Sequence, residues 1–209
     1  MMWAILNDLM QRFISLDKWE QRNNLRQSVQ SLSLPRGSKV LDFGCGTGLF
    51  ARVFMKMGLN YYGYDIDKRL ISYARRLYRN CQFTASKDEL IKQAPFDLII
   101  SNCCFHHIDS ATLCEELIGI RKILSGNGTF MMIDILFSER DPSLFRKLFR
   151  KLELGMHVRV MDDYRRIVEQ HFSIIKTDIV RSHLFSIKNN PIYNDLAIFE
   201  CKANFRVGR

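Results

Sequence analysis

Three glycines alternate in the segment Val40–Phe50, immediately after an apolar run that contains one acidic residue. Gly44, Gly46 and Gly48 lack a side chain, so a ligand can approach the backbone and the chain can take positive φ angles. We predict that a strand ends here and a helix begins, which leaves N–H groups facing a crevice at the carboxyl end of a sheet. A tight turn without a ligand is the simpler interpretation of the glycines alone. The GxGxG spacing differs from that of dinucleotide sites and of phosphate-binding loops.

Asp65 ends the next apolar run, YYGYD, about 20 residues after the first glycine. A carboxylate at the end of a second strand can accept hydrogen bonds from both hydroxyls of a ribose. Because the glycine segment has no lysine for a phosphate group, the two features together indicate a nucleoside ligand without phosphate. Asp42 could contact this ligand or could fix the loop by accepting backbone hydrogen bonds, and both interpretations stay open.

Composition and charge limit the class of protein. The chain has 209 residues, enough for one well-packed domain, and no apolar run is long enough for a transmembrane helix. The start of the chain lacks a basic leader, and six scattered cysteines without a CxxC pair indicate reduced thiols, so we expect a cytoplasmic protein. The net charge of +9 allows attraction to nucleic acid, to an anionic membrane or to an acidic small molecule, without choosing among them.

The order of apolar runs and amphipathic stretches predicts an α/β fold. Strand and helix repeated in this way form a mostly parallel, doubly wound, Rossmann-like sheet with helices on both faces. The last two runs, FSIIKTDIV and DLAIFECKANF, are separated by a turn at NNP, so we expect an antiparallel hairpin at one edge and seven strands in all. The first five strands are expected at Lys39–Phe43, Tyr61–Asp65, Gln82–Ala85, Phe96–Asn102 and Gly128–Leu136, with helices at Phe50–Met57, Lys68–Arg79, Asp88–Gln93 and Ala111–Leu124.

We expect one domain with four parts along the chain. These parts are a helical cap over residues 1–34, a cofactor-binding core over 35–137, a helical lid insertion over 138–160, and a C-terminal helix and hairpin over 161–209. Within the insertion, LFRKLFRKLEL (144–154) places leucine and phenylalanine on one helical face and arginine and lysine on the other. A helix packed on the domain with a solvated basic face is the simpler interpretation, and contact with an anionic membrane is the alternative.

Several motifs taken together resemble the class I S-adenosylmethionine-dependent methyltransferases. Within that class, the chain is most similar to the small-molecule branch that includes ubiquinone- and menaquinone-biosynthesis-type enzymes. The resemblance rests on VLDFGCGTG, GYDID, FDLIISNCCFHHI and GTFMMIDIL, and covers roughly residues 38–136. It implies transfer of a methyl group from S-adenosyl-L-methionine to a small molecule, for which an apolar or lipid-like acceptor is one option.

Two other functions remain as alternatives. Methylation of RNA or protein is suggested by the charge, but the fourth strand is followed by SNCC rather than an NPPY-type tetrapeptide, and no RNA-binding module is appended. We therefore do not expect nucleic acid as a partner. A non-catalytic scaffold that binds the cofactor is the second alternative, because the glycines and Asp65 indicate binding and not turnover.

The resemblance implies a role for each residue that matches a family motif. The expected cofactor-binding residues are Asp42, Gly44, Cys45, Gly46, Gly48, Asp65, Ile66, Ser86 and Asn102. In the family, the glycine segment lines the methionine part, the acid after the second strand holds the ribose, and the next residue packs on the adenine. The family's adenine-binding acid after the third strand has no direct match, because FTASKDEL offers only Ser86 or Asp88 as a substitute.

His106 and His107 are the expected catalytic residues, and His107 is favoured as the one that lines the pocket. The family that this chain resembles often has a histidine near the active site at this position. A phenol or alcohol acceptor would need a general base, and histidine is suited to that role. His157 is a further candidate. Adjacent residues at a strand exit are expected to point apart, and no other cysteine or histidine has metal-ligand spacing, so no metal site is expected.

Overall fold

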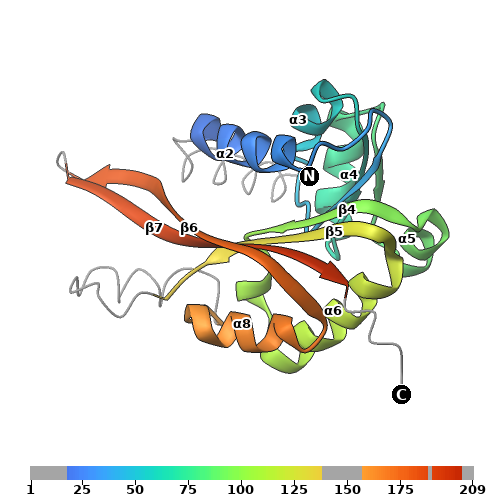
Figure 1. Cartoon of the computed structure of the whole chain (residues 1–209). Helices are drawn as coiled ribbons and strands as arrows, with labels where there is room; N and C mark the ends of the chain where they lie inside the picture. The colour runs from blue at the N-terminus through green and yellow to red at the C-terminus, as the bar shows by residue number, and fades with distance from the viewer. Residues whose placement is uncertain (1–17, 138–156, 188–189, 204–209) are drawn as a thin grey trace, which may run out of the picture.

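Seven strands form one sheet in a computed structural model, which describes residues 18–137, 157–187 and 190–203 (Figure 1). The strand order is β3-β2-β1-β4-β5-β7-β6. The pairs among β1 to β5 are parallel, and β7 pairs antiparallel with both β5 and β6. The predicted doubly wound sheet with an antiparallel hairpin at its edge is confirmed. The strands are β1 Lys39–Phe43, β2 Asn60–Tyr64, β3 Gln82–Thr84, β4 Phe96–Asn102, β5 Leu124–Ile135, β6 Phe172–Ile187 and β7 Asn190–Ala203.

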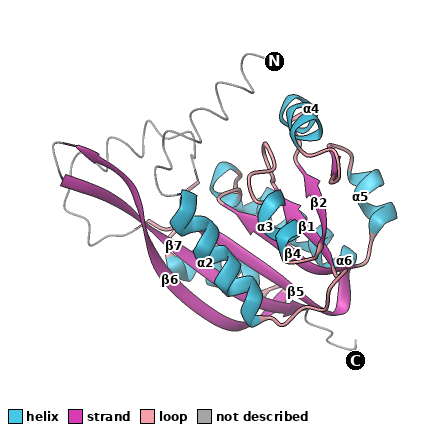
Figure 2. Ribbon diagram, turned by 90° about the horizontal axis from the view of Figure 1, so that it is seen from above, coloured by secondary structure: helices cyan, strands magenta, loops and turns pink. Residues whose placement is uncertain are grey.

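Helices cover both faces of the sheet (Figure 1, Figure 2). On one face lie α2 (Lys18–Ser31), α3 (Ala51–Lys56) and α4 (Lys68–Leu77). On the other face lie α5 (Lys87–Gln93), α6 (Ser110–Ile123) and α8 (Met161–Glu169). A short 3-10 turn, η1 (Phe105–His107), follows β4. Among the described helices, none is long and apolar enough to cross a membrane.

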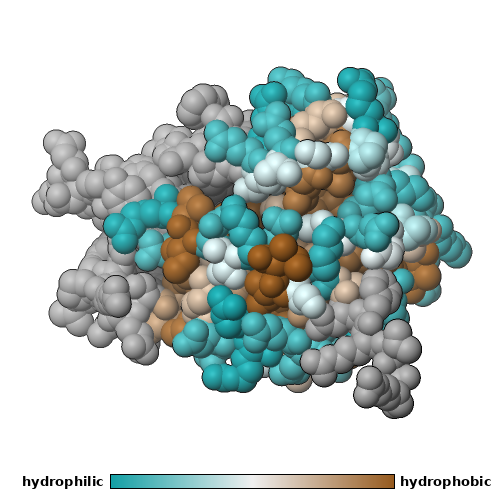
Figure 3. Space-filling model, viewed as in Figure 1, coloured by the Kyte–Doolittle hydropathy of each residue, from teal (hydrophilic) through white to brown (hydrophobic). Residues whose placement is uncertain are grey.

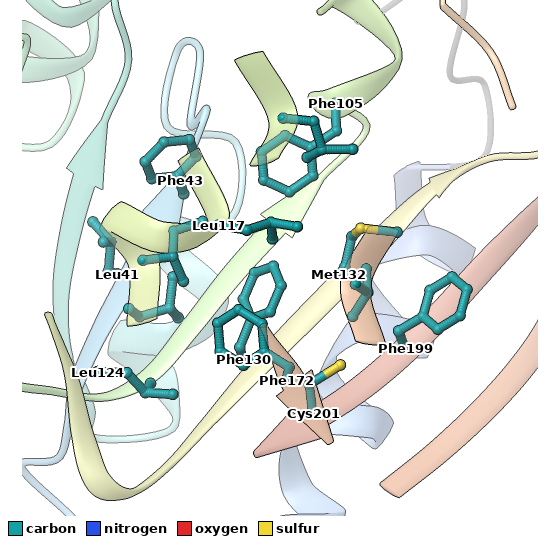
Figure 4. Packing of buried hydrophobic residues seen from close by; sticks show 14 of the residues in the cluster. Leu41, Phe43, Phe105, Leu117, Leu124, Phe130, Met132, Phe172, Phe199 and Cys201 are labelled. Carbon is teal, nitrogen blue, oxygen red and sulfur yellow. The ribbon is translucent and has the colours of Figure 1, made fainter. Parts of the chain in front are cut away.

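Each face of the sheet has its own hydrophobic core. Successive side chains of a strand point to opposite faces, so Met131 belongs to the core under α2, α3 and α4, while its neighbour Met132 belongs to the other core. Figure 4 shows this second core, in which Phe130, Met132, Phe172 and Phe199 of three strands pack together. Because the helices cover both faces, β1 and β4 are buried almost throughout, as in other parallel sheets.

The surface that Figure 3 shows is mostly hydrophilic, with isolated apolar patches between charged groups. The large apolar side chains that stay exposed in the described part of the chain are Met55, Ile66, Leu77, Ile91, Ile118, Phe137, Ile175 and Ile179. Ile66 is the most exposed of these, at 82%. Since it directly follows β2 and Asp65, this exposed side chain lies at the carboxyl edge of the sheet.

The edge hairpin is longer than the sequence predicted. Pairing of β6 with β7 runs from Phe172↔Ala203 to Ile187↔Asn190, whereas β5 accompanies β7 only as far as Ile135↔Leu196. The outer part is therefore a two-stranded ribbon that extends beyond the sheet (Figure 1). The predicted strand ended near Val180, which is the point where β5 stops pairing with β7. Beyond it, β6 and β7 still pair with each other, because two antiparallel strands satisfy the backbone groups that face one another without a third strand.

Of the four expected parts of the chain, the described residues include much of the cap, the whole core and most of the C-terminal helix and hairpin. Residues 1–17 of the cap and most of the lid insertion, with the basic segment 144–154, lie outside the described residues. The described end of the insertion returns to the sheet at Arg159, which forms an isolated parallel bridge with Leu136.

Candidate functional site

The glycine segment connects β1 to α3 in a loop that takes positive φ at all three glycines. The φ angles are +79° at Gly44, +53° at Gly46 and +77° at Gly48. The amides of Gly44 and Cys45 both donate to the carbonyl of Tyr64, at 2.8 and 2.9 Å, which ties the loop to the end of β2. A Cβ at Gly44 would overlap the side chain of Cys104, so the loop needs a glycine here for its packing as well as for its backbone.

Asp65 joins the end of β2 to this loop. One carboxylate oxygen accepts from the Gly46 amide at 2.8 Å, and the other accepts from the Asp67 amide at 2.9 Å. Burial raises the pKa of Asp65, and these two hydrogen bonds act in the opposite direction. Each oxygen keeps a lone pair for a further donor, which suits the two hydroxyls of a ribose. With exposed Ile66 beside it, the site fits an adenosine group: Asp65 would hold the ribose and Ile66 would contact the adenine.

Asp42 lies under the glycine loop and not on its surface. Its side chain is 2% exposed and accepts a hydrogen bond of 2.7 Å from the Tyr61 hydroxyl. Burial raises the pKa of Asp42 to about 7, which the Tyr61 hydrogen bond counteracts in part. Direct contact between Asp42 and a ligand would require the glycine loop to move. A structural role, in which Asp42 supports the loop from below, is compatible with the loop as it stands.

Ser86 caps the helix that follows β3. Its hydroxyl accepts from the Glu89 amide at 3.3 Å, and its own amide donates to the Thr84 hydroxyl at 3.0 Å. Ser86 also borders a cavity of about 480 Å³ between α4 and the end of β3. The other lining residues are Lys68, Ile71, Ser72, Arg75, Arg76, Thr84, Ala85 and Glu89. The capping hydroxyl can still donate one hydrogen bond, while the alternative adenine contact, Asp88, is exposed in the first turn of α5.

The segment after β4 brings the two histidines together. Asn102 ends the strand, Cys103 takes a φ of +52°, and η1 follows. The expectation that the adjacent histidines point apart is wrong: their ring centroids are 4.0 Å apart, with 43° between the planes. The reason is that both belong to a 3-10 turn and not to extended chain. His107 is exposed, and when protonated it would lower the pKa of Asp65, whereas His106 is only 6% exposed.

Asp134 of β5 is a buried acceptor beneath η1. Its carboxylate accepts from the amides of Phe105 at 2.7 Å and His106 at 3.2 Å, and from the Ile135 amide at 2.8 Å. His106 Nδ1 lies 2.5 Å from the same carboxylate. Asp134 is not among the residues predicted for the site, although a charged residue inside the apolar run FMMIDIL was a signal for a role.

Arg159 holds the opposite end of the same turn. Its guanidinium donates to the carbonyls of Phe105 at 3.1 Å and Ile108 at 2.7 Å, and to that of His157 at 3.0 Å. Arg159 is 7% exposed, and no sequence pattern singled it out. The η1 turn thus lies between a buried acid at its amides and a buried guanidinium at its carbonyls, which favours both ends electrostatically.

Other titratable groups near η1 stay protonated. Burial raises the pKa of the Cys45 and Cys104 thiols and of the Tyr164 hydroxyl, and nearby carboxylates raise them further. The Tyr164 hydroxyl is buried without a hydrogen-bond partner among the described residues. None of these three groups is therefore suited to act as a base. Within residues 18–137, 157–187 and 190–203, no group of three His, Cys, Asp or Glu side chains is placed to hold a metal ion.

The fold and this site together define a class I methyltransferase that uses S-adenosylmethionine as its methyl donor. The chain belongs to the methyltransferase domain family, whose model matches residues 17–178. The residues that the structure brings together at the carboxyl edge of the sheet are the glycine loop, Asp65, Ile66 and the segment after Asn102.

Similar proteins include an uncharacterized methyltransferase of Geobacillus sp. (strain WCH70), which is 25% identical over 147 residues, 68% of each chain. The malonyl-[acyl-carrier protein] O-methyltransferase of Halalkalibacterium halodurans is 27% identical over 137 residues, which are 61% of this chain and 48% of the relative. A TehB-like SAM-dependent methyltransferase from Corynebacterium glutamicum has a TM-score of 0.62 at 17% identity, covering 95% and 97% of the two chains. At this identity, the last likeness shows the fold alone.

Proposed function

We propose that this chain transfers the methyl group of S-adenosylmethionine to a small-molecule acceptor. The observation that carries the proposal is the hydrogen bond between Asp65 and the Gly46 amide. It sets a carboxylate with two remaining lone pairs against a loop without side chains, next to the exposed Ile66. When bound, S-adenosylmethionine supplies an activated methyl group on a sulfonium ion, so the protein's main task is to orient donor and acceptor.

Two observations favour a small molecule over RNA or protein as the methyl acceptor. The segment after β4 reads SNCC and forms the η1 turn, where an NPPY-type tetrapeptide would indicate a planar nitrogen acceptor. The printed name of one relative, malonyl-[acyl-carrier protein] O-methyltransferase, states that this relative methylates an oxygen of a small group on a carrier. The chain covers 48% of that relative's length, so the acceptor of this chain remains a proposal.

Calorimetry with S-adenosylmethionine and S-adenosylhomocysteine tests the first half of the proposal. We expect both to bind below millimolar concentration, one per chain, and failure of both to bind would overturn the function. The second half is tested with methyl-labelled S-adenosylmethionine and cell extract separated into small molecules, lipid, RNA and protein. Label in the small-molecule or lipid fraction supports the proposal. Label in RNA, with binding that weakens steeply as salt rises, would support the nucleic-acid alternative instead.

Two further expectations belong to the same proposal. All six cysteines lie among the described residues and none forms a disulfide, which agrees with work in a reducing compartment such as the cytoplasm. Contact with an anionic membrane through residues 144–154 is tested by co-sedimentation with phosphatidylserine vesicles. Arg150→Glu together with Lys151→Glu should abolish sedimentation if this segment binds, and sedimentation that survives the change would exclude the segment as the cause.

A further inference from the structure

The pair formed by His106 and Asp134 has the arrangement of a base and the carboxylate that orients it. Asp134 is fully buried, and backbone amides of Phe105, His106 and Ile135 donate to its oxygens. A carboxylate that already receives three donors can only accept from the imidazole. We therefore assign the imidazole proton to Nδ1, which lies 2.5 Å from the carboxylate. In the neutral imidazole, this leaves the lone pair on Nε2.

The second nitrogen of this imidazole has no structural use in the described part of the chain. No described residue makes a hydrogen bond to His106 Nε2, although the whole side chain is only 8% exposed. A histidine that serves only to tie β5 to η1 would need Nδ1 alone.

The pair is close to the cofactor side of the site. The His106 ring is 4.0 Å from that of His107, and a protonated His107 would lower the pKa of Asp65. Cys104, which precedes the turn, packs against Gly44. The amide of His157 donates to the His106 carbonyl at 3.0 Å, so the insertion returns to the sheet beside the same residue. His106 therefore lies between the residues that contact the glycine loop and the segment that returns from the insertion.

We propose that His106 is the general base of this enzyme, that Asp134 positions it, and that the acceptor is a neutral hydroxyl compound such as a phenol or an alcohol. This inference rests on the proposed function. The hydroxyl oxygen attacks the methyl carbon, a C–O bond forms, and the C–S bond breaks with its electron pair left on sulfur. The hydroxyl proton passes to His106 Nε2 and then to water, and the imidazolium is stabilised in the meantime by Asp134. An amine, a thioether or a carboxylate acceptor would not need such a base.

Other groups surround the pair and also respond to pH. They are His107 on the same turn, His157 and Arg159 on the returning segment, Tyr164 on α8, and Cys103 and Cys104 after β4. Burial keeps the thiol of Cys104 and the hydroxyl of Tyr164 protonated, and Arg159 donates to carbonyls. His107 and His157 are thus the competing bases that the experiment must separate from His106.

The main variant is His106→Asn, because the asparagine Nδ2 can still donate to Asp134 while the basic nitrogen is lost. Labelled S-adenosylmethionine is supplied with the small-molecule fraction of cell extract, and the pH dependence of methyl transfer is compared for H106N, H107N, H157N and wild type. We expect H106N to lose about 100-fold or more in kcat and to lose the acidic limb of the pH profile. Its affinity for S-adenosylhomocysteine and its Tm should stay close to those of the wild type. The control variant is His171→Asn, outside this cluster, which should keep the wild-type profile.

The chemistry of the labelled product gives a second arm. Label that resists alkali and is released as methyl iodide by hydriodic acid is a methyl ether, as expected for a hydroxyl acceptor. Label that is released by alkali as methanol is an ester, and this or an N-, S- or C-methyl product would overturn the inference. So would a loss of the acidic limb in H107N or H157N with H106N unaffected.

A third experiment uses wild-type protein alone and does not depend on measuring methyl transfer. In wild-type protein with 15N-labelled histidine and bound S-adenosylhomocysteine, NMR should show neutral His106 with its proton on Nδ1. A proton on Nε2 would overturn the inference. If S-adenosylhomocysteine does not bind and no fraction takes label, the proposed function itself fails. The tautomer in the free protein then decides the His106–Asp134 pair separately.

Discussion

The carboxylate of Asp65 and the amide of Gly46 are joined by a hydrogen bond of 2.8 Å, across two loops that are far apart in sequence. This bond connects the loop after β1 to the loop after β2 at the carboxyl edge of the sheet. It also leaves each carboxylate oxygen with capacity for one more donor. The relationship connects the two features that indicated a nucleoside in the sequence, the side-chain-free turn and the acid on the neighbouring strand.

Asp65→Ala should weaken S-adenosylmethionine binding by about tenfold or more, because two hydrogen bonds to a charged acceptor are lost. Calorimetry measures the dissociation constant. The matched control is Asp67→Ala, two residues away, whose carboxylate caps α4 through the Arg69 amide. That change should reduce stability by about 0.5–2 kcal/mol and leave the affinity unchanged. Equal affinities in D65A and wild type would refute the ribose role.

Asp42 should make stability depend on pH in a particular direction. Burial raises its pKa in the folded protein from the ordinary 3.8 to about 7, so between these values the folded state holds a proton that the unfolded state has lost. The free energy of unfolding therefore falls as pH rises through this window, and the contribution is fully present only below about pH 4. In Asp42→Asn this contribution is absent. The free energy of unfolding of D42N relative to wild type should rise by roughly 2–3 kcal/mol from pH 5 to pH 8.

Urea unfolding at several pH values measures this difference. Tyr61→Phe provides a second variant, because it removes the hydrogen bond of 2.7 Å that favours the charged form of Asp42. We expect Y61F to raise the pKa of Asp42 further and to steepen the pH dependence in the same direction. A difference between D42N and wild type that is constant from pH 5 to pH 8 would contradict the assignment.

The parts of the fold that could be predicted are those that depend on local patterns. Amphipathic stretches such as Lys68–Arg79 predicted helices such as α4, and apolar runs between turns predicted the strands, because these patterns are properties of neighbouring residues. The glycine spacing likewise predicted the loop after β1. The length of the hairpin was not predicted. The apolar pattern marks the part of β6 and β7 that packs in the sheet beside β5, whereas the pairing of β6 with β7 continues beyond β5.

The contacts that were missed join residues far apart in the sequence. Arg159 reaches Phe105 and Ile108 only because the chain returns beside β5 after the insertion. The orientation of His106 depends on Asp134 of another strand and on a 3-10 turn that no residue pattern marks. Such contacts follow from the packed arrangement of the sheet, so the sequence could suggest residues for the site but not their partners.

Gly44→Ala should lower stability more than the same change at Gly37. Both glycines have positive φ, +79° and +84°, so alanine costs roughly 1–2 kcal/mol at either position. At Gly37 a Cβ would meet nothing within 4 Å, whereas at Gly44 it would overlap the side chain of Cys104. We expect this overlap to add roughly 1–3 kcal/mol, measured by urea unfolding. Equal losses in G44A and G37A would show that the loop yields freely at Gly44.

Arg159→Met should destabilise the protein by roughly 2–4 kcal/mol, because one buried and two partly buried hydrogen bonds to carbonyls lose their donor while a methionine fills part of the space. Arg159→Lys should recover only a fraction of this stability. The compact ammonium group lacks the planar set of N–H donors with which guanidinium reaches the carbonyls of Phe105, Ile108 and His157 together. Arg166→Met is the matched control. Arg166 is 72% exposed and forms an ion pair of 3.1 Å with Asp163, so its loss should cost less than about 1 kcal/mol.

The same variants distinguish a stabilising residue from one that also orders the turn. If Arg159 fixes η1, amide hydrogen exchange at Phe105, His106 and His107 should become faster in R159M than in R166M, by more than the change in global stability explains. In R159K the exchange should lie between the two. Exchange at η1 that follows global stability alone in all three variants would show that Asp134 is sufficient to hold the turn.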